Sequence, residues 1–157
     1  MADSKDVFKH LENVLYLKNF TPFSGLKTDE LRAIAVIARE ITVPDHYCIV
    51  RENDAGDSFF IVKKGTLRVA KGGDKAQVEV GTVGENEVFG EMALFEEDKL
   101  RSASIYARGE CTLLVIQKDD FMRALKQFPD ISIELLKLFA RRLRDTNKKV
   151  LEQTQKI

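Results

Sequence analysis

Apolar residues recur at helical spacing near both ends of the chain and at alternate positions in its middle. A period near 3.6 residues indicates amphipathic helices, and a period of two indicates strands with one buried face. The pattern therefore predicts helical ends over 1–40 and 118–157 around a strand-rich segment from about 41 to 117. Many short strands at regular spacing are typical of an antiparallel sandwich, roll or barrel. We expect an α+β fold, mainly β, as a single domain over 1–157.

Two helices are expected before the strands. The first covers 6–17 and places three large apolar residues on one face: Phe8, Leu11 and Leu15. A loop with Pro22 and Gly25 separates it from the second helix. Thr28 is expected to cap that helix, because its hydroxyl can accept a hydrogen bond from an amide of the first turn. The buried stripe of the second helix is expected to hold Leu31, Ile34, Ala35 and Ala38.

The expected strands lie between glycine-containing or acidic turns. The β-rich segments are 47–50, 58–62, 67–71, 77–83, 102–107 and 112–117. Gly65 and Gly84 are expected to separate neighbouring strands. The pair Gly72-Gly73 is a strong hairpin signal, since two-residue turns often need positive φ angles.

Helical spacing returns at Asp119 and is interrupted by Pro129. Asp130 is expected to cap a long terminal helix over 131–151. Four residues of that helix fall close to a heptad seam: Leu136, Phe139, Leu143 and Val150. We expect the helix to pack against its own strands, with a homodimer through this C-terminal helix as the alternative.

Composition limits the classes of partner. The 157 residues include 25 Lys+Arg and 25 Asp+Glu, and a formal net charge of zero argues against a general nucleic-acid binder. No apolar run approaches the roughly 20 residues of a membrane-spanning helix, and the N-terminus lacks the apolar stretch of a secretion signal. Cys48 and Cys111 are expected to be small buried residues. We expect a cytoplasmic protein that binds no metal and no nucleic acid and does not insert into a membrane.

One segment carries the parts of an anion-binding site. It reads Val-Phe-Gly-Glu-Met-Ala-Leu-Phe over 88–95 and is followed by Arg-Ser-Ala at 101–103. Gly90 allows a ligand to approach the backbone closely, and Arg101 carries a guanidinium that can form paired hydrogen bonds with phosphate oxygens. Glu91 only accepts hydrogen bonds, so its carboxylate suits a sugar hydroxyl and not a phosphate.

This segment resembles the phosphate-binding cassette of the cyclic nucleotide-binding domain family, in the form found in bacterial catabolite activators. Phe23-Ser24-Gly25-Leu26 resembles the entry motif of that family, and the run over 56–69 matches its early strands. The resemblance covers roughly 20–143. It implies an antiparallel, jelly-roll-like β-roll with N-terminal helices, a short cassette helix and C-terminal helices.

The resemblance also implies roles for the matching residues. Glu91 would accept the ribose 2′-hydroxyl, Arg101 would hold the cyclic phosphate, and Phe89 would line the pocket. Gly90 would lie near the ribose, and backbone amides near Met92, Ala93 and Ala103 would complete the cradle. The expected ligand-binding residues are Phe89, Gly90, Glu91, Met92, Ala93, Arg101, Ser102 and Ala103.

Ser102 bears on which base is bound. A hydroxyl after the arginine favours guanine in some members of the family, whereas bacterial activators with the same Arg-Ser-Ala respond to cyclic AMP. We expect cAMP as the ligand, with cGMP less favoured. The base is expected to lie against apolar strand residues such as Val80 or Val83.

No catalytic constellation accompanies the cassette. The sequence has no nucleophile elbow, HExxH motif or P-loop, and His10 and His46 lie far apart. We therefore expect no enzymatic activity and no cofactor. Because no helix-turn-helix, kinase or channel segment precedes Ile157, we expect a stand-alone sensor that signals to a protein effector by moving its C-terminal helix. The alternatives are a nucleotide-independent adaptor and a regulatory domain excised from a larger channel, kinase or transcription factor.

The zero net charge combines two segments of opposite sign. The segment 84–98 carries only acidic charges: Glu85, Glu87, Glu91, Glu96, Glu97 and Asp98. The segment 137–149 is mainly basic, with Lys137, Arg141, Arg142, Arg144, Lys148 and Lys149 against Asp145. We expect the basic helix to offset the acidic cassette when it closes as a lid over the base, with surface screening keeping the effect modest.

Overall fold

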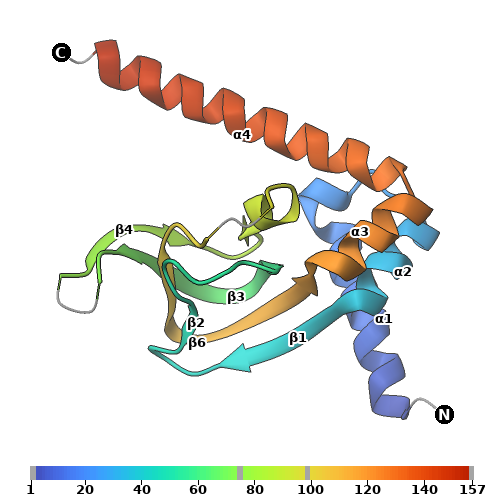
Figure 1. Cartoon of the computed structure of the whole chain (residues 1–157). Helices are drawn as coiled ribbons and strands as arrows, with labels where there is room; N and C mark the ends of the chain where they lie inside the picture. The colour runs from blue at the N-terminus through green and yellow to red at the C-terminus, as the bar shows by residue number, and fades with distance from the viewer. Residues whose placement is uncertain (1–2, 74–75, 98–99, 156–157) are drawn as a thin grey trace. The chain divides into compact units, whose positions relative to one another are not determined.

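The computed structural model describes residues 3–73, 76–97 and 100–155 of the chain. The helical elements are α1 (Ser4–Asn19), η1 (Thr21–Phe23), α2 (Thr28–Ile37), η2 (Glu91–Leu94), α3 (Lys118–Gln127) and α4 (Asp130–Gln155). The strands are β1 (Ala38–Val43), β2 (Cys48–Val50), β3 (Ser58–Lys71), β4 (Val78–Val83), β5 (Val88–Phe89) and β6 (Ser104–Gln117). Figure 1 labels all of these strands except β5. The chain forms two compact units, one of residues 36–123 and one of residues 1–35 with 124–157.

The unit of residues 36–123 is built on a six-stranded antiparallel sheet. Its main strand order is β1–β6–β3–β4, while β2 pairs with β6 and β5 pairs with β3. Buried apolar side chains from several strands form its core, among them Val62, Leu67 and Leu113. The helices that precede and follow the strands in the chain complete the expected α+β fold, which is confirmed.

Strands β3 and β6 each replace two of the predicted strands. Gly65 was expected to end a strand, but β3 continues through it with a φ of 98°, and β6 continues through Gly109 with a φ of 73°. The pairing of β3 with β6 shifts register on both sides of Lys64. Such a bulge absorbs an irregular residue without ending the strand. The prediction of separate strands was wrong, because glycine marks bulges as well as turns.

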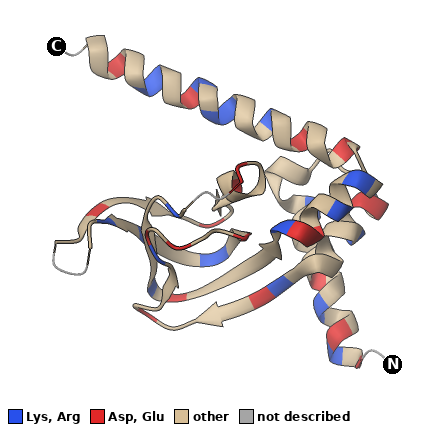
Figure 2. Cartoon of the chain, viewed as in Figure 1, with Lys and Arg blue, Asp and Glu red and all other residues tan. Residues whose placement is uncertain are grey.

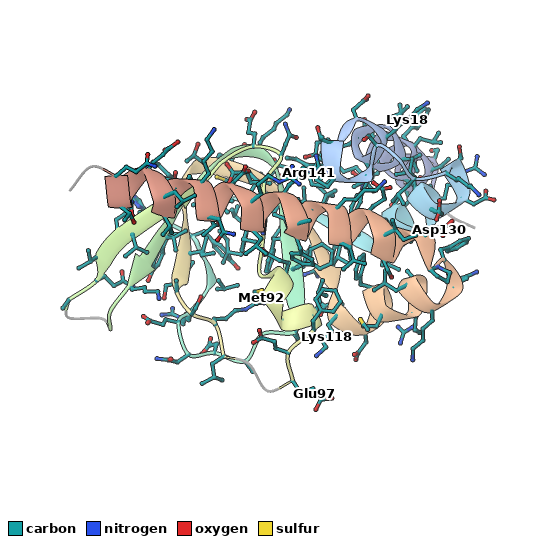
Figure 3. All side chains as sticks on the ribbon, turned by 90° about the horizontal axis from the view of Figure 1, so that it is seen from above. Lys18, Met92, Glu97, Lys118, Asp130 and Arg141 are labelled. Carbon is teal, nitrogen blue, oxygen red and sulfur yellow. The ribbon has the colours of Figure 1, made fainter. Side chains whose placement is uncertain are left out.

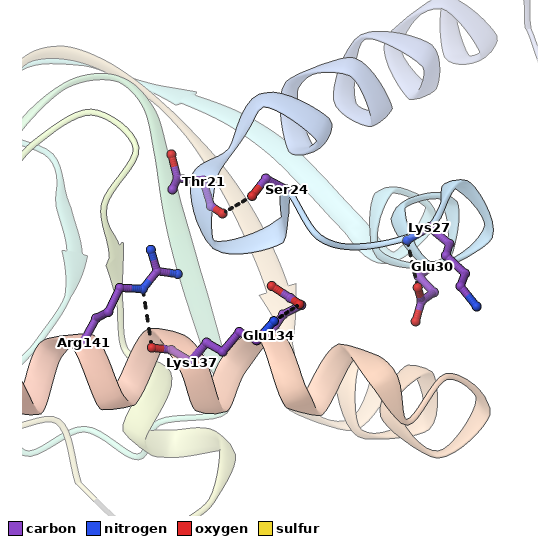
Figure 4. Close-up of polar contacts among 7 residues, drawn as sticks. All are labelled: Thr21, Ser24, Lys27, Glu30, Glu134, Lys137 and Arg141. Atoms are coloured by element: carbon purple, nitrogen blue, oxygen red, sulfur yellow. Dashed lines mark hydrogen bonds and ion pairs between the residues drawn. The ribbon is translucent and has the colours of Figure 1, made fainter.

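The start of α2 and of the sheet also differs from the prediction. The Leu31 amide donates to the Lys27 carbonyl, and the Lys27 amide donates to the Glu30 carboxylate at 2.8 Å, as drawn in Figure 4. Lys27 therefore occupies the capping position, and Thr28 is the first helical residue. Ala38, predicted on the buried stripe of α2, is instead the first residue of β1 and is half-buried.

The predicted hairpin at Gly72-Gly73 is present as the β3–β4 pair. Lys71 pairs with Val78, so the connection is longer than the two residues that the glycine pair suggested. Residues 74–75 of this connection lie outside the described ranges. Among the other predicted positions, Cys111 is fully buried and Cys48 is half-buried, and Asp130 is the first helical residue of α4.

One close approach in the unit of residues 1–35 and 124–157 involves Gly25. A Cβ atom at Gly25 would lie 2.7 Å from Oε1 of Glu134, so the end of this side chain of α4 would have to shift if residue 25 were not glycine. Lys137 forms an ion pair with the same carboxylate at 3.1 Å (Figure 4). Buried apolar side chains stabilise the unit around this contact, including Phe20, Phe23, Ile131 and Leu135.

Two predicted apolar stripes of this unit are not buried. α1 is a helix as predicted, but Phe8, Leu11 and Leu15 are all exposed. On α4, Leu136, Leu143 and Val150 of the predicted heptad seam are exposed, and Phe139 is half-buried.

We expect Gly65→Ala to destabilise the chain. The new Cβ would lie 2.6 Å from Sγ of buried Cys111, and the positive φ adds about 1–3 kcal/mol of backbone strain. Urea unfolding followed by circular dichroism measures the loss. Gly109→Ala, which has positive φ but no atom within 4 Å of its Cβ, should cost less, and Gly81→Ala should be close to neutral. Equal stability of all three variants would contradict the clash.

Candidate functional site

A cavity of about 330 Å³ lies within the unit of residues 36–123. Ligand pockets in proteins are typically about 300–1,000 Å³, so this one is large enough for a small molecule. All of the residues predicted for ligand binding line it: Phe89, Gly90, Glu91, Met92, Ala93, Arg101, Ser102 and Ala103. The structure thus brings the predicted cassette and the predicted arginine segment together around one space.

The cassette is fixed to the sheet through Phe89. Phe89 pairs with Phe60 between β5 and β3, and their rings stack with centroids 4.6 Å apart. Gly90 follows with a left-handed φ of 79°, which turns the chain from β5 into the short helix η2. Within η2, Ala93 is buried, while Met92 is exposed and is labelled in Figure 3. The backbone of the cassette therefore begins at the end of a strand whose position the sheet fixes.

The Arg101 side chain lies between two glycines. A Cβ atom at Gly56 would lie 3.0 Å from Nε of Arg101, and a Cβ atom at Gly90 would lie 2.6 Å from its Nη1. The same guanidinium donates from Nη2 to the Ser58 carbonyl at 2.8 Å. A Cβ atom at Gly90 would overlap the guanidinium, and one at Gly56 would force the side chain to shift by a few tenths of an ångström.

The backbone of Arg101 is held as well. Its amide donates to the Asp54 carbonyl at 2.7 Å, and its carbonyl accepts from the Asn53 amide at 2.9 Å. The loop between β2 and β3 thus fixes the main chain of Arg101, and the start of β3 fixes the side chain. An arginine held at both ends loses little further freedom on binding an anion.

Burial sets the electrostatics of this arginine. Desolvation lowers the pKa of the Arg101 guanidinium below its usual value, and the Asp57 carboxylate partly opposes this by raising that pKa. An arginine remains charged at neutral pH even so. The guanidinium also lies 5.8 Å from the centroid of the Phe60 ring. A partly desolvated cation interacts with an anion more strongly than a hydrated one does.

Two of the three predicted backbone donors are available. Within the described residues, the amides of Met92 and Ala103 donate no hydrogen bond to the protein. The Ala93 amide, in contrast, donates to the Gly90 carbonyl at 3.2 Å. Glu91 is half-buried and Ser102 is exposed on the cavity lining. Arg101, two amides, one carboxylate and one hydroxyl thus share a single cavity.

The prediction missed half of the apolar wall. Of the two candidates for contact with a base, Val83 lines the cavity, whereas Val80 is exposed and does not. The missed lining residues are Val50, Val69, Val88, Leu100 and Ile105. Cross-strand pairing explains part of this wall, since Ile105 of β6 pairs with Val69 and with Val50. The alternation of apolar residues along each strand could have identified candidates for this wall. The sequence does not show, however, which strands pair with each other.

The charge around the cassette is acidic. The predicted acidic residues Glu85, Glu87, Glu91, Glu96 and Glu97 lie in the described part of 84–97, which carries no Lys or Arg, as the red positions of Figure 2 indicate. Glu97 is exposed and is labelled in Figure 3, while Asp98 lies outside the described residues. An anionic ligand would therefore meet repulsion outside the cavity and attraction at Arg101.

In the ranges 3–73, 76–97 and 100–155, no three His, Cys, Asp or Glu side chains are placed to hold a metal ion. No helix in those ranges has both the length and the apolar character that crossing a bilayer requires.

The chain matches a known family. Residues 40–128 match the model of the cyclic nucleotide-binding domain. The chain is 28% identical over 134 residues to the cyclic AMP receptor protein of Thermus thermophilus, which covers 83% of this chain and 61% of that protein. It is also 28% identical over 128 residues to a voltage-gated inwardly rectifying potassium channel of Oryctolagus cuniculus, which covers 81% of this chain and 11% of that protein. The chain thus spans less than two thirds of either relative.

A solved structure shares the fold. The regulatory domain of Toxoplasma gondii PKA, co-crystallised with cAMP, matches with a TM-score of 0.74 at 24% sequence identity. The match covers 90% of this chain and 52% of that one.

We expect Gly56→Ala to displace the Arg101 side chain, because the new Cβ would lie 3.0 Å from Nε. The Nε–H resonance of Arg101 in a nitrogen–proton NMR spectrum reports this directly. It should shift strongly in Gly56→Ala and stay in place in Gly73→Ala, where no atom lies within 4 Å of the new Cβ. An unmoved resonance in Gly56→Ala would show that the guanidinium does not depend on this glycine.

Proposed function

Because the chain belongs to the cyclic nucleotide-binding domain family, we propose that it is a sensor module that binds cAMP, with cGMP as the weaker ligand. The observation that carries the proposal is the placement of the Arg101 guanidinium between Gly56 and Gly90 on the wall of the cavity. A fixed, partly desolvated guanidinium suits the charge and the geometry of a cyclic phosphate.

The remaining polar groups suit the rest of a nucleotide. The half-buried Glu91 carboxylate is a hydrogen-bond acceptor and would accept a hydrogen bond from the ribose 2′-hydroxyl. The amides of Met92 and Ala103 would donate to phosphate oxygens, so the cyclic phosphate would be held by both charge and backbone. The Ala93 amide would join them only by leaving the Gly90 carbonyl.

The lining of the cavity supports the proposed preference for cAMP. Among its described lining residues, Glu91, Arg101 and Ser102 are the ones with polar side chains, and the first two would be engaged by the ribose and the phosphate. Guanine has more polar groups on its edge than adenine. In this cavity each of these groups would lose its hydration without gaining a hydrogen-bond partner. Ser102 alone would compensate part of that cost. The apolar wall that includes Val83 would contact the face of the base.

The output we propose is regulatory, not catalytic. A ligand changes a conformational equilibrium only by its differential affinity for the two states. We propose that nucleotide binding favours a position of α4 in which the helix closes over the base and presents a changed surface to a protein effector. The basic residues of α4 would then offset the acidic charge of 84–97. The location proposed for this sensor is the cytoplasm.

Calorimetric titration with cAMP and with cGMP tests the site. We expect micromolar binding of cAMP, weaker binding of cGMP, and a loss of about 1.5–3 kcal/mol in Arg101→Ala, because a charge-assisted hydrogen bond disappears. That loss corresponds to roughly ten- to hundredfold weaker binding. Arg39→Ala, which removes an exposed arginine of the same unit that does not line the cavity, is the matched control.

Two results would count against the proposal. If wild-type protein binds neither nucleotide more tightly than about millimolar, where binding is worth only about 4 kcal/mol, the sensor function is wrong. If Arg101→Ala binds cAMP as well as wild-type protein does, the nucleotide lies elsewhere.

Neutralising three arginines of α4 tests the closing helix. Replacing Arg141, Arg142 and Arg144 with Gln should weaken cAMP binding more at low salt than at high salt, because exposed charges are screened over about 10 Å at 0.1 M salt. Titrations at two ionic strengths measure the difference. An equal loss at both would rule out electrostatic compensation by this helix, and no loss at either would contradict its closing over the nucleotide.

A further inference from the structure

Helix α1 packs within its unit through its less apolar side. Asn13 and Leu17 are 3% and 0% exposed. The opposite face carries the α1 stripe, which we define as Val7, Phe8, Leu11 and Leu15, with exposures of 49%, 68%, 51% and 61%. Spacings of one, four and eight residues place these side chains on adjoining parts of one face. Burial of apolar surface normally turns such a face inward, so the stripe has the character of a contact surface.

We propose that the α1 stripe is the contact between two copies of this chain, with the two α1 helices antiparallel about a two-fold axis. A two-fold contact buries the same surface on both copies and must be complementary to itself. The charges beside the stripe meet this condition.

Lys5 and Glu12 lie on the same edge of the stripe, two helical turns apart. Both are exposed, and neither forms an ion pair with another described residue. In an antiparallel pair, the beginning of one helix lies beside the later turns of the other. Lys5 of each copy would therefore face Glu12 of the partner subunit, which gives two opposite-charge contacts in one register. In a parallel pair this edge of one helix would face the other edge of the partner helix, so Lys5 and Glu12 would not meet.

A lipid surface suits the stripe less well than a second copy does. Helices that bind anionic membranes carry an excess of Lys and Arg on their polar face. In α1 and its N-cap, three basic residues are balanced by three acidic ones: Lys5, Lys9 and Lys18 against Asp3, Asp6 and Glu12. No net positive charge is therefore available to attract anionic lipid.

The contact is small, so the association should be weak. Two 16-residue helices bury less surface than the roughly 1,600 Å² of a standard protein interface. The dimer should therefore depend on protein concentration. It involves no residue of the nucleotide cavity, so it can be tested with no nucleotide present and does not depend on the proposed function.

Sedimentation velocity over a concentration series tests the dimer. Wild-type protein should shift from monomer to dimer as its concentration rises. Phe8→Glu and Leu11→Glu should each weaken the dimer by about tenfold or more, because in this register each puts a charge close to the two-fold axis at the centre of the apolar contact. Val36→Glu is the matched control: Val36 is 70% exposed, lies outside α1 and should leave the dimer unchanged.

A charge swap tests the antiparallel register. Lys5→Glu and Glu12→Lys should each weaken the dimer severalfold, and the double variant should restore it, since both cross-copy contacts re-form with their signs exchanged. All of these residues are exposed, so circular dichroism should show that each variant folds as wild-type protein does.

The opposite results overturn the proposal. A chain that stays monomeric at every concentration has no such contact. A dimer that survives Leu11→Glu but is lost in Leu143→Glu lies on α4. Co-sedimentation of the monomer with phosphatidylserine vesicles, lost in Leu11→Glu, would assign the stripe to a membrane. Failure of the double charge variant to restore the dimer would exclude the antiparallel register.

Discussion

The hydrogen bond from the Arg101 guanidinium to the Ser58 carbonyl is the contact on which the candidate site depends. It places a cation on the wall of an otherwise mainly apolar cavity, and Gly56 and Gly90 leave space for this cation on either side. The cost is partial desolvation of a charge, which lowers the pKa of Arg101. The Arg101 side chain is already desolvated and ordered before any ligand arrives. An arriving anion therefore interacts with the guanidinium without having to order this side chain.

The sheet supplies the rigidity that this contact needs. Ser58 begins β3, and Phe60 lies further along the same strand and stacks on Phe89 of β5. The groups that hold the arginine and the residue that anchors the cassette therefore share one strand. Because β3 pairs along most of its length with β6, a shift of either group would require a shift in strand register, which would expose the buried face.

The acidic charge around the cavity favours selective binding of anions over general electrostatic attraction. The cassette segment is acidic, so an anion gains little from the surface and depends on a few oriented groups inside: the Arg101 guanidinium and the amides of Met92 and Ala103. Anions that cannot use all of these groups would be rejected by the surrounding carboxylates. The exposed apolar stripes of α1 and α4 belong to the unit of residues 1–35 and 124–157, whereas the cavity belongs to the unit of residues 36–123.

The sequence by itself determined the features that depend on neighbours in the chain. The helical and strand periods, the cassette and its arginine were all predictable, because each is a short contiguous pattern, and every predicted site residue lines the cavity. The tertiary structure decided what depends on residues far apart. It placed Val69 and Ile105 together on the cavity wall through strand pairing, and it continued β3 through Gly65 because β6 accommodates a bulge there. It also turned the apolar face of α1 outward. Local periodicity defines an apolar face, but the partner that covers that face is chosen only when distant segments pack.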